Sequence, residues 1–212
     1  MRILFLSTWF PSPPDNGSKL RVYHLLRALA LHNQVTLLSF SFDTARPETP
    51  GELCDWCQEI QVVAADPFAV NQEGALRTFL SYRPVASRPL PAMSQRIAGV
   101  LSSHAFDAVI ASTDMMVDYA LRTPPGLVRI LEEHNNMTRW AWERFDEADG
   151  VVQQTRRWLS WQKSRLYEAR TYPGFDLITM VSEADRQTTV DTIGNSRSRV
   201  EVVPNGVDCT YN

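Results

Sequence analysis

Short apolar runs alternate with longer amphipathic segments along almost the whole chain. A run of about four to eight apolar residues between polar or Pro/Gly positions is typical of a buried strand, whereas apolar residues recurring at helical spacing are typical of a helix. The runs that predict strands are 2–8, 34–41, 60–64, 107–112, 126–134, 175–182 and 199–204. The segments that predict helices are 19–32, 52–58, 72–81, 93–103, 115–121, 136–146, 151–172 and 183–193.

This alternation predicts the fold class. Parallel strands need a crossover between them, and right-handed helical crossovers cover both faces of a sheet. We therefore expect an α/β fold, a Rossmann-like three-layer α/β/α sandwich whose mainly parallel sheet has about seven strands. In the first helix, Leu20, Tyr23 and Leu26 recur near helical spacing and are expected on its buried face.

The composition is that of a globular protein, with 44% hydrophobic and 21% charged residues in a chain of 212. A net charge of −3 gives no basic field for nucleic acid, and no apolar run reaches the roughly 20 residues of a membrane span. The first residues lack the pattern of a signal peptide. Three cysteines are an odd set that fits a reducing compartment, so we expect a cytoplasmic protein. The histidines are scattered and the pair Cys54 and Cys57 has no second pair, so no metal site is expected.

The first candidate site is the turn Asn16-Gly17-Ser18, between the first strand and the first helix. Glycine lets a ligand approach the backbone, and the free N–H groups of a helix start attract phosphate. The alternative is an ordinary strand-to-helix turn in which Ser18 caps the helix. A single glycine without GxGxxG or GxxxxGKS argues against both a classical dinucleotide fold and a P-loop kinase.

A second polar cluster, from Glu132 to Asn136, follows the apolar strand at 126–134. Open α/β sheets bind their ligands at the carboxyl ends of the strands, so Glu133 and Asn135 are expected at a cleft edge. His134 could donate a hydrogen bond to a sugar hydroxyl or to a developing charge. In the alternative interpretation, Asn135 or Asn136 caps the next helix and His134 is merely exposed.

Two more segments carry candidate polar groups. Ser182 and Asp185 have the spacing of a capping box, and Ser182 and Glu183 would lie at the same sheet edge. The helix 153–172 has five basic residues against one acidic, with two tryptophans beside them. Such a helix can attach to an anionic membrane surface, although more often it simply covers a sheet. Four arginines could grip an acidic or phosphorylated acceptor, namely Arg77, Arg83, Arg88 and Arg96.

Four segments in order resemble the amino-terminal half of GT-B glycosyltransferases, most closely the retaining family 4. They are ILFLSTWFPSPPDNGSKLRVYHLLRALA, EEHNNMTRW, ITMVSEADR and VEVVPNGVD. In that family two Rossmann-like domains face each other across a cleft. The resemblance implies that residues 1–208 form the acceptor-side domain and that 209–212 begin the linker to a carboxyl-terminal, donor-binding domain.

The resemblance also implies roles for particular residues. Gly17 matches the loop that faces the donor phosphates and the acceptor, although Asn16 stands where the family often has a first glycine. His134 matches the histidine near the transferred sugar. Asn205 and Gly206 lie in the run that matches the interdomain junction, and the family's donor-binding residues would follow it.

The implied function is transfer of a sugar from a nucleotide-sugar donor to a hydroxyl of an acceptor glycan or lipid, with retained anomeric configuration. The donor is a substrate, so no cofactor and no metal is expected, and neither is a nucleic-acid partner. The setting would be polysaccharide or glycolipid synthesis, with peripheral contact at the inner membrane face through 153–172. The isolated domain should be inactive because catalysis needs both substrates in one cleft. Two alternatives stay open: a non-catalytic nucleotide- or sugar-phosphate-binding domain, and half of a GT-B nucleotide-sugar epimerase.

Overall fold

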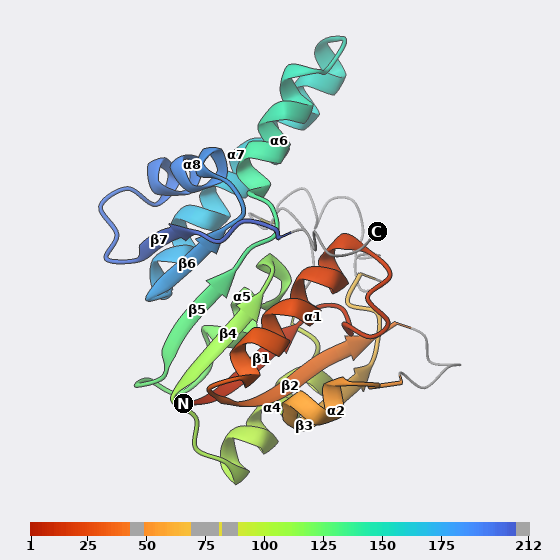
Figure 1. The fold of residues 1–212 in the computed structure, drawn as a ribbon. Coiled ribbons are helices and arrows are strands. Elements are labelled where there is room, and N and C mark those ends of the chain that lie inside the picture. The colour runs from red at the N-terminus through yellow and green to blue at the C-terminus, as the bar shows by residue number, and fades with distance from the viewer. Residues whose placement is uncertain (43–48, 69–80, 82–88, 207–212) are drawn as a thin grey trace.

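A seven-stranded sheet runs across the molecule, with helices on both of its faces (Figure 1). The computed structural model describes residues 1–42, 49–68, 81 and 89–206. Its strands are β1 Arg2–Ser7, β2 Gln34–Ser41, β3 Cys57–Ala64, β4 Ala108–Ser112, β5 Val128–Glu132, β6 Leu177–Met180 and β7 Arg199–Val202. They are ordered β3-β2-β1-β4-β5-β6-β7, and every neighbouring pair is parallel. The predicted Rossmann-like α/β fold is therefore confirmed.

The helices divide between the two faces according to the direction in which the chain crosses the sheet. Their bounds are α1 Gly17–Ala30, α2 Leu53–Trp56, α4 Pro91–Ser103, α5 Val117–Ala120, α6 Met137–Asp146, α7 Val151–Thr171 and α8 Glu183–Ile193, with 3-10 turns at Asp114–Met116 and Tyr172–Gly174. Side chains of α1 and α2 pack on one face, and those of α4, α5 and α7 pack on the other. Strand residues alternate between these two cores: Ile3 and Phe5 face α1, whereas Leu4 and Leu6 face α4.

Two details of the first helix differ from the sequence prediction. Its cap is Asn16, whose side chain accepts a hydrogen bond from the Lys19 N–H, so the expectation that Ser18 is the cap was wrong. Leu20, expected on the buried face, is 43% exposed, and Arg21 is buried instead. The helix predicted at 72–81 lies outside the described residues except for Ser81.

Helices α6 and α7 form a hairpin whose turn projects away from the sheet (Figure 1). Trp142 and Trp161 hold the two helices together, with ring centroids 4.8 Å apart. Near the turn α7 has α6 as its neighbour, whereas Tyr167, near its other end, joins the core beside the sheet. The part of the hairpin near its turn is therefore stabilised mainly by its own aromatic contacts.

Candidate functional site

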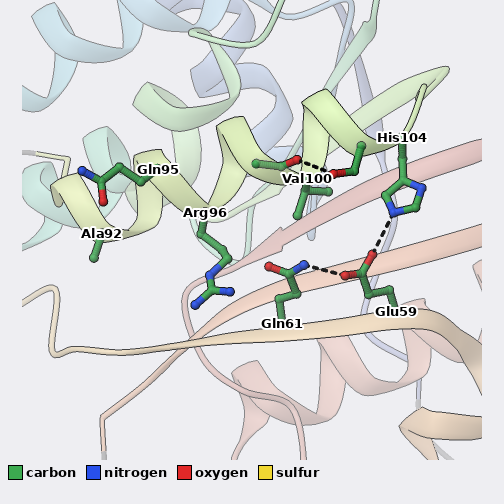
Figure 2. A pocket seen from close by; sticks show the side chains of 9 residues that line it. Glu59, Gln61, Ala92, Gln95, Arg96, Val100 and His104 are labelled. Carbon is green, nitrogen blue, oxygen red and sulfur yellow. Dashed lines mark hydrogen bonds and ion pairs between the residues drawn. The ribbon is translucent and has the colours of Figure 1, made fainter.

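A groove of about 480 Å³ lies between edge strand β3 and α4 (Figure 2). Its polar groups include Glu59 and Gln61 from the strand, and the imidazole of His104 lies 3.4 Å from the Glu59 carboxylate. Arg96, one of the four arginines considered for an acceptor, lines this groove, whereas the other three lie outside the described residues. The remaining candidate residues lie elsewhere, most of them where the strands end.

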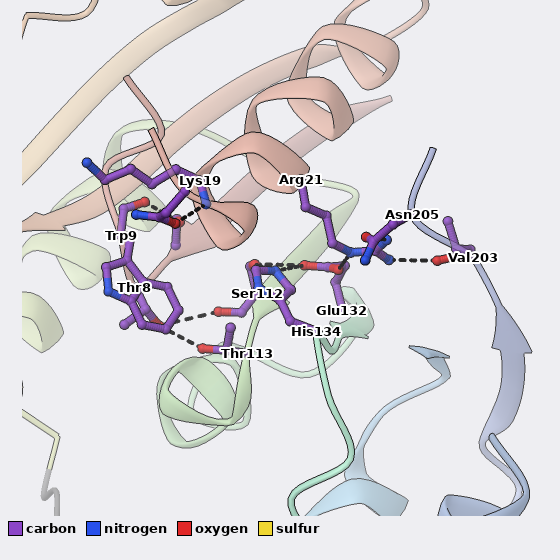
Figure 3. Close-up of polar contacts among 12 residues, drawn as sticks. Thr8, Trp9, Lys19, Arg21, Ser112, Thr113, Glu132, His134, Val203 and Asn205 are labelled. Atoms are coloured by element: carbon purple, nitrogen blue, oxygen red, sulfur yellow. Dashed lines mark hydrogen bonds and ion pairs between the residues drawn. The ribbon is translucent and has the colours of Figure 1, made fainter. Parts of the chain in front are cut away.

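Four largely buried polar side chains meet at the carboxyl ends of β4 and β5 (Figure 3). Arg21 Nε donates to Glu132 Oε1 at 2.5 Å, and both side chains are 6% exposed. His134 Nε2 lies 3.0 Å from Glu132 Oε2 and 3.2 Å from Ser112 Oγ. Ser112 Oγ in turn donates to Glu132 Oε2 at 2.7 Å. Glu132 is thus the common partner of one cation, one imidazole and one hydroxyl.

His134 is largely enclosed, because its side chain is only 10% exposed. The interpretation that it is merely an exposed residue beside a helix cap is therefore wrong. The other half of that interpretation is confirmed, since the Asn136 side chain accepts from the Arg139 N–H and caps α6. Asn135 itself is exposed.

The cluster also reaches the segment that follows β7 (Figure 3). Arg21 donates to the Val203 carbonyl at 2.9 Å and to Asn205 Oδ1 at 2.8 Å. Gly206, the other residue expected at a junction, is exposed. One guanidinium therefore connects the first helix, the end of β5 and the segment beyond β7.

Strained backbone lies beside this cluster. Thr113, directly after β4, has a φ of +77°, a conformation that costs a β-branched residue energy. Its hydroxyl lies 2.7 Å from that of Thr8, and its N–H donates to the Glu132 carbonyl at 2.8 Å. Such strain persists where surrounding contacts hold it, often at functional sites.

A row of aromatic rings continues from His134 along the sheet edge. Trp9, after β1, stacks on the imidazole with centroids 6.5 Å apart and on Phe68, after β3, at 6.1 Å. Phe42, after β2, lies edge-on to Phe68 at 5.9 Å. Phe42 and Phe68 are 38% and 39% exposed, so this aromatic row offers apolar surface next to the polar cluster.

Electrostatics favour an ionised Glu132. Burial alone would raise the pKa of this carboxyl, but the hydrogen bond from His134 and the charges of His134 and Arg21 outweigh it and lower the pKa below its ordinary value. An ionised carboxylate can only accept hydrogen bonds, which suits all three of its partners. The cluster therefore keeps a negative charge buried beside the imidazole.

The neighbouring Glu133 points to the other face of the sheet and is 2% exposed. Its Oε1 accepts from the Tyr172 hydroxyl at 2.8 Å. Burial, together with the charges of Asp114 and Glu168, raises its pKa well above the usual range. Burial likewise raises the pKa of Asp114 to about 6 and that of Glu168 to about 7. Glu133, Glu168 and Tyr172 are buried and Asp114 is partly exposed; we call these four residues the buried acid cluster.

The Asn16-Gly17-Ser18 turn opens α1 as expected, but Gly17 does not use its conformational freedom. Its φ is not in the left-handed region, and a Cβ atom there would meet nothing within 4 Å. Two residues after β6, Ser182 caps α8 by accepting a hydrogen bond from the Asp185 N–H at 3.1 Å. Glu183 forms an exposed ion pair with Arg186 at 2.6 Å.

The sequence reasoning did not select Arg21, Ser112 or Trp9. A signal for Ser112 was present, since Ser-Thr follows the apolar residues of both β1 and β4, which are neighbours in the sheet. Within the described ranges no group of three or more His, Cys, Asp or Glu side chains could hold a metal ion. No helix in that part of the chain is long and apolar enough to cross a membrane.

Three solved structures with a similar fold are distant in sequence. Sucrose-phosphate synthase from Thermosynechococcus elongatus is 13% identical with a TM-score of 0.60, over 98% of this chain and 48% of that one. α,α-Trehalose 6-phosphate synthase from Burkholderia multivorans is 13% identical with a TM-score of 0.52, over 98% and 50%. Medicago truncatula UGT71G1, complexed with UDP-glucose, is 11% identical with a TM-score of 0.52, over 98% and 52%. The chain thus spans about half the length of these proteins.

Sequence comparison assigns the family. No curated protein is significantly similar in sequence. The family model described as Glycosyltransferase Family 4, however, matches residues 15–211, which is nearly the whole chain. The protein therefore belongs to glycosyltransferase family 4, and its fold is that of one half of a GT-B glycosyltransferase.

Proposed function

We propose that this chain is the acceptor-side half of an enzyme that moves a sugar from a nucleotide-sugar donor to an acceptor hydroxyl. The observation that carries the proposal is the polar cluster around Glu132 and His134, lying beside the aromatic row at the carboxyl edge of the sheet. That edge is where open α/β sheets bind ligands. Aromatic faces pack against sugar rings or apolar chains, while the polar cluster supplies hydrogen bonds to hydroxyls.

In this proposal the donor diphosphate faces the start of α1. The N–H groups and dipole of this 14-residue helix would favour an anionic group beside Gly17. Transfer forms a bond between the acceptor oxygen and the anomeric carbon and breaks the bond from that carbon to the diphosphate, which receives the hydroxyl proton. Retained configuration, as in the resemblance, is part of the proposal.

The segment around Asn205 and Gly206 is proposed as the junction to a second, donor-binding domain, with 209–212 as the start of the linker. The support is that the matched proteins are about twice as long as this chain. Both substrates must be oriented in one cleft for transfer, so a chain of this length alone should turn over poorly.

The experiment that tests the proposal compares His134→Ala with Leu31→Ala, an exposed residue just after the end of α1, in the full-length enzyme. We expect sugar transfer from a panel of nucleotide sugars to fall about 100-fold or more in His134→Ala and to stay unchanged in the control. Wild-type turnover in a folded His134→Ala protein would contradict the role of His134. Absence of transfer with every donor would favour the non-catalytic domain, and release of nucleoside diphosphate without acceptor would favour the epimerase.

Peripheral contact with an anionic membrane is the second part of the proposal, and polysaccharide or glycolipid synthesis on the cytoplasmic side is its setting. The single acidic residue of 153–172, Glu168, is buried at 1% exposure, so the outward charges of this segment are all basic. Trp158 is half-exposed, and Val151 and Val152 at the turn are 80% and 75% exposed. Basic side chains beside exposed apolar groups suit an anionic lipid surface.

Vesicle sedimentation tests this contact. The protein should sediment with vesicles containing phosphatidylglycerol, not with pure phosphatidylcholine, and salt should weaken the binding because it screens exposed charges. Replacing Arg156 and Arg157 by Gln should reduce sedimentation, whereas Arg199→Gln, on the edge strand β7, should not. Binding that is insensitive to salt, or absent altogether, would refute the membrane contact.

A further inference from the structure

One ring nitrogen of His134 has no partner. Nδ1 is buried, and no hydrogen bond to it is formed by any of the residues that the structure describes. A buried polar atom without a partner is costly, and native proteins keep few of them. The other nitrogen, Nε2, faces both Glu132 Oε2 and Ser112 Oγ.

The partners of Nε2 decide where the imidazole proton lies. Glu132 forms a buried ion pair with Arg21, so its oxygens can only accept hydrogen bonds. Ser112 gives its own proton to Glu132 Oε2, which leaves a lone pair of the hydroxyl for Nε2. Both neighbours therefore require the proton on Nε2, and in the neutral ring Nδ1 then carries the lone pair.

Arg21 fixes the orientation of Glu132. Its Nε–H binds Oε1, the carboxylate oxygen that His134 and Ser112 do not use. Its two terminal nitrogens bind Val203 and Asn205, so the guanidinium is held at both ends. The carboxylate is thus fixed on one side by Arg21 and presents its other oxygen to the imidazole (Figure 3).

We propose that Glu132 and Arg21 are positioning residues that hold His134 as the Nε2–H tautomer, so that Nδ1 accepts a hydrogen bond from a ligand hydroxyl. The sequence suggested His134 as a donor, and this geometry makes it an acceptor. Nδ1 is buried and the ring stacks against Trp9, so a hydroxyl that binds there has to displace the loop after β1. Only the identity of the ligand as a sugar rests on the proposed function.

Nitrogen NMR of the chain labelled with ¹⁵N-histidine tests the proposal directly. At a pH where the ring is neutral, two-bond ¹H–¹⁵N spectra should show His134 with a protonated Nε2 and an unprotonated Nδ1. His134→Asn assigns the signals by removing them. A neutral wild-type ring with its proton on Nδ1 would overturn the proposal without reference to any activity.

The variant Glu132→Gln tests the source of the tautomer. An amide offers a donor as well as an acceptor, so the strong preference for Nε2–H should be lost and Nδ1–H should become populated. Glu143→Gln, in an exposed ion pair with Arg139, is the matched control and should leave the His134 signals unchanged. An unchanged tautomer in folded Glu132→Gln would show that Glu132 has no positioning role.

Arg21→Lys and Arg21→Met distinguish the role of Arg21 in orienting Glu132 from its role in stabilising the fold. Lysine keeps the charge and should preserve most of the tautomer preference, whereas methionine should weaken it in molecules that remain folded. If both variants keep the wild-type spectrum, Arg21 does not position Glu132. In the full-length enzyme, Glu132→Gln should lower kcat by about tenfold or more, because a misplaced proton removes the acceptor for the hydroxyl. A failure of transferase activity in the wild type would refute the proposed function and leave the NMR result intact.

Discussion

Glu132 and Glu133 are adjacent residues with the same side chain, yet they lie in opposite environments. Glu132 faces α1, is ionised, and binds Arg21 and His134. Glu133 faces α7 and belongs to the buried acid cluster, where its pKa is raised. The alternation of side chains at the end of a strand is enough to separate them. Burial alone therefore does not decide the charge of a carboxyl group, because nearby hydrogen-bond donors and cations can outweigh it.

The largest expected effect is the loss of the cation. Arg21→Met leaves the Glu132 carboxylate buried without its ion-pair partner, so the free energy of unfolding should fall by about 3–5 kcal/mol in urea denaturation. Arg139→Met, which removes a partly exposed ion pair with Glu143, is the control and should cost about 1 kcal/mol or less. Equal decreases in the free energy of unfolding of the two variants would contradict the idea that Arg21 stabilises a buried Glu132 carboxylate.

The pH dependence of stability should separate the two sides of the sheet. In the buried acid cluster, burial raises the pKa of Glu168 from 4.5 to about 7 and that of Asp114 from 3.8 to about 6. The folded state then holds more protons than the unfolded state, so the stability that these groups contribute is complete below their unfolded pKa values. It is lost as the pH rises from about 4 to 7, by roughly 3 kcal/mol for each of the two carboxyls.

Glu168→Gln should flatten this decline, because the amide stays neutral at every pH. Glu143→Gln is exposed and should leave the slope unchanged. The opposite sign holds for Glu132, whose lowered pKa makes its contribution disappear only as the pH falls through that low value. A stability that rises between pH 5 and 7 in the wild type would contradict the buried acid cluster.

Activity should distinguish the two carboxyls as well. In the proposed full-length enzyme, Glu132→Gln should lower turnover about tenfold, equivalent to about 1.4 kcal/mol of activation free energy. Glu133→Gln replaces a protonated acid by a neutral amide of similar shape, so kcat should change by less than about twofold. A larger decrease in kcat for Glu133→Gln than for Glu132→Gln, in variants of equal stability, would contradict the proposal that Glu132 belongs to the site and Glu133 does not.

The smallest expected effect on stability is at Gly17. In Gly17→Val the new Cβ meets nothing within 4 Å. The free energy of unfolding should therefore change by less than about 1 kcal/mol, the difference in helix propensity between the two residues. If α1 faces the donor diphosphate, turnover in the proposed full-length enzyme should nevertheless fall strongly. Unchanged turnover would remove the turn from the site.

The fold could be predicted from the sequence because it depends on local patterns. Apolar runs such as Ile3 to Leu6 predicted central strands, and the polar residues after β5 predicted where a ligand site would lie. The strand period also places Glu132 and His134 on one face of the sheet and Glu133 on the other.

The partners within the site could not be predicted in the same way. Arg21 is separated from Glu132 by 111 positions and from Asn205 by 184. Helical spacing favoured Leu20 as the buried residue. Only the folded structure shows that the neighbouring Arg21 is buried instead, because it pairs with the Glu132 carboxylate. Long-range ion pairs leave no local periodicity, so sequence patterns of one chain do not reveal them.

The hairpin of α6 and α7 has a practical consequence. Its turn at residues 147–150 projects away from the sheet and from the carboxyl end of β5 (Figure 1). Inserting a peptide epitope or a fluorescent protein there should leave the sheet folded, since no strand has to be rebuilt. The turn is thus a suitable attachment point for labels. A label there would report on the proposed membrane contact of the hairpin without touching the proposed transfer site at the sheet edge.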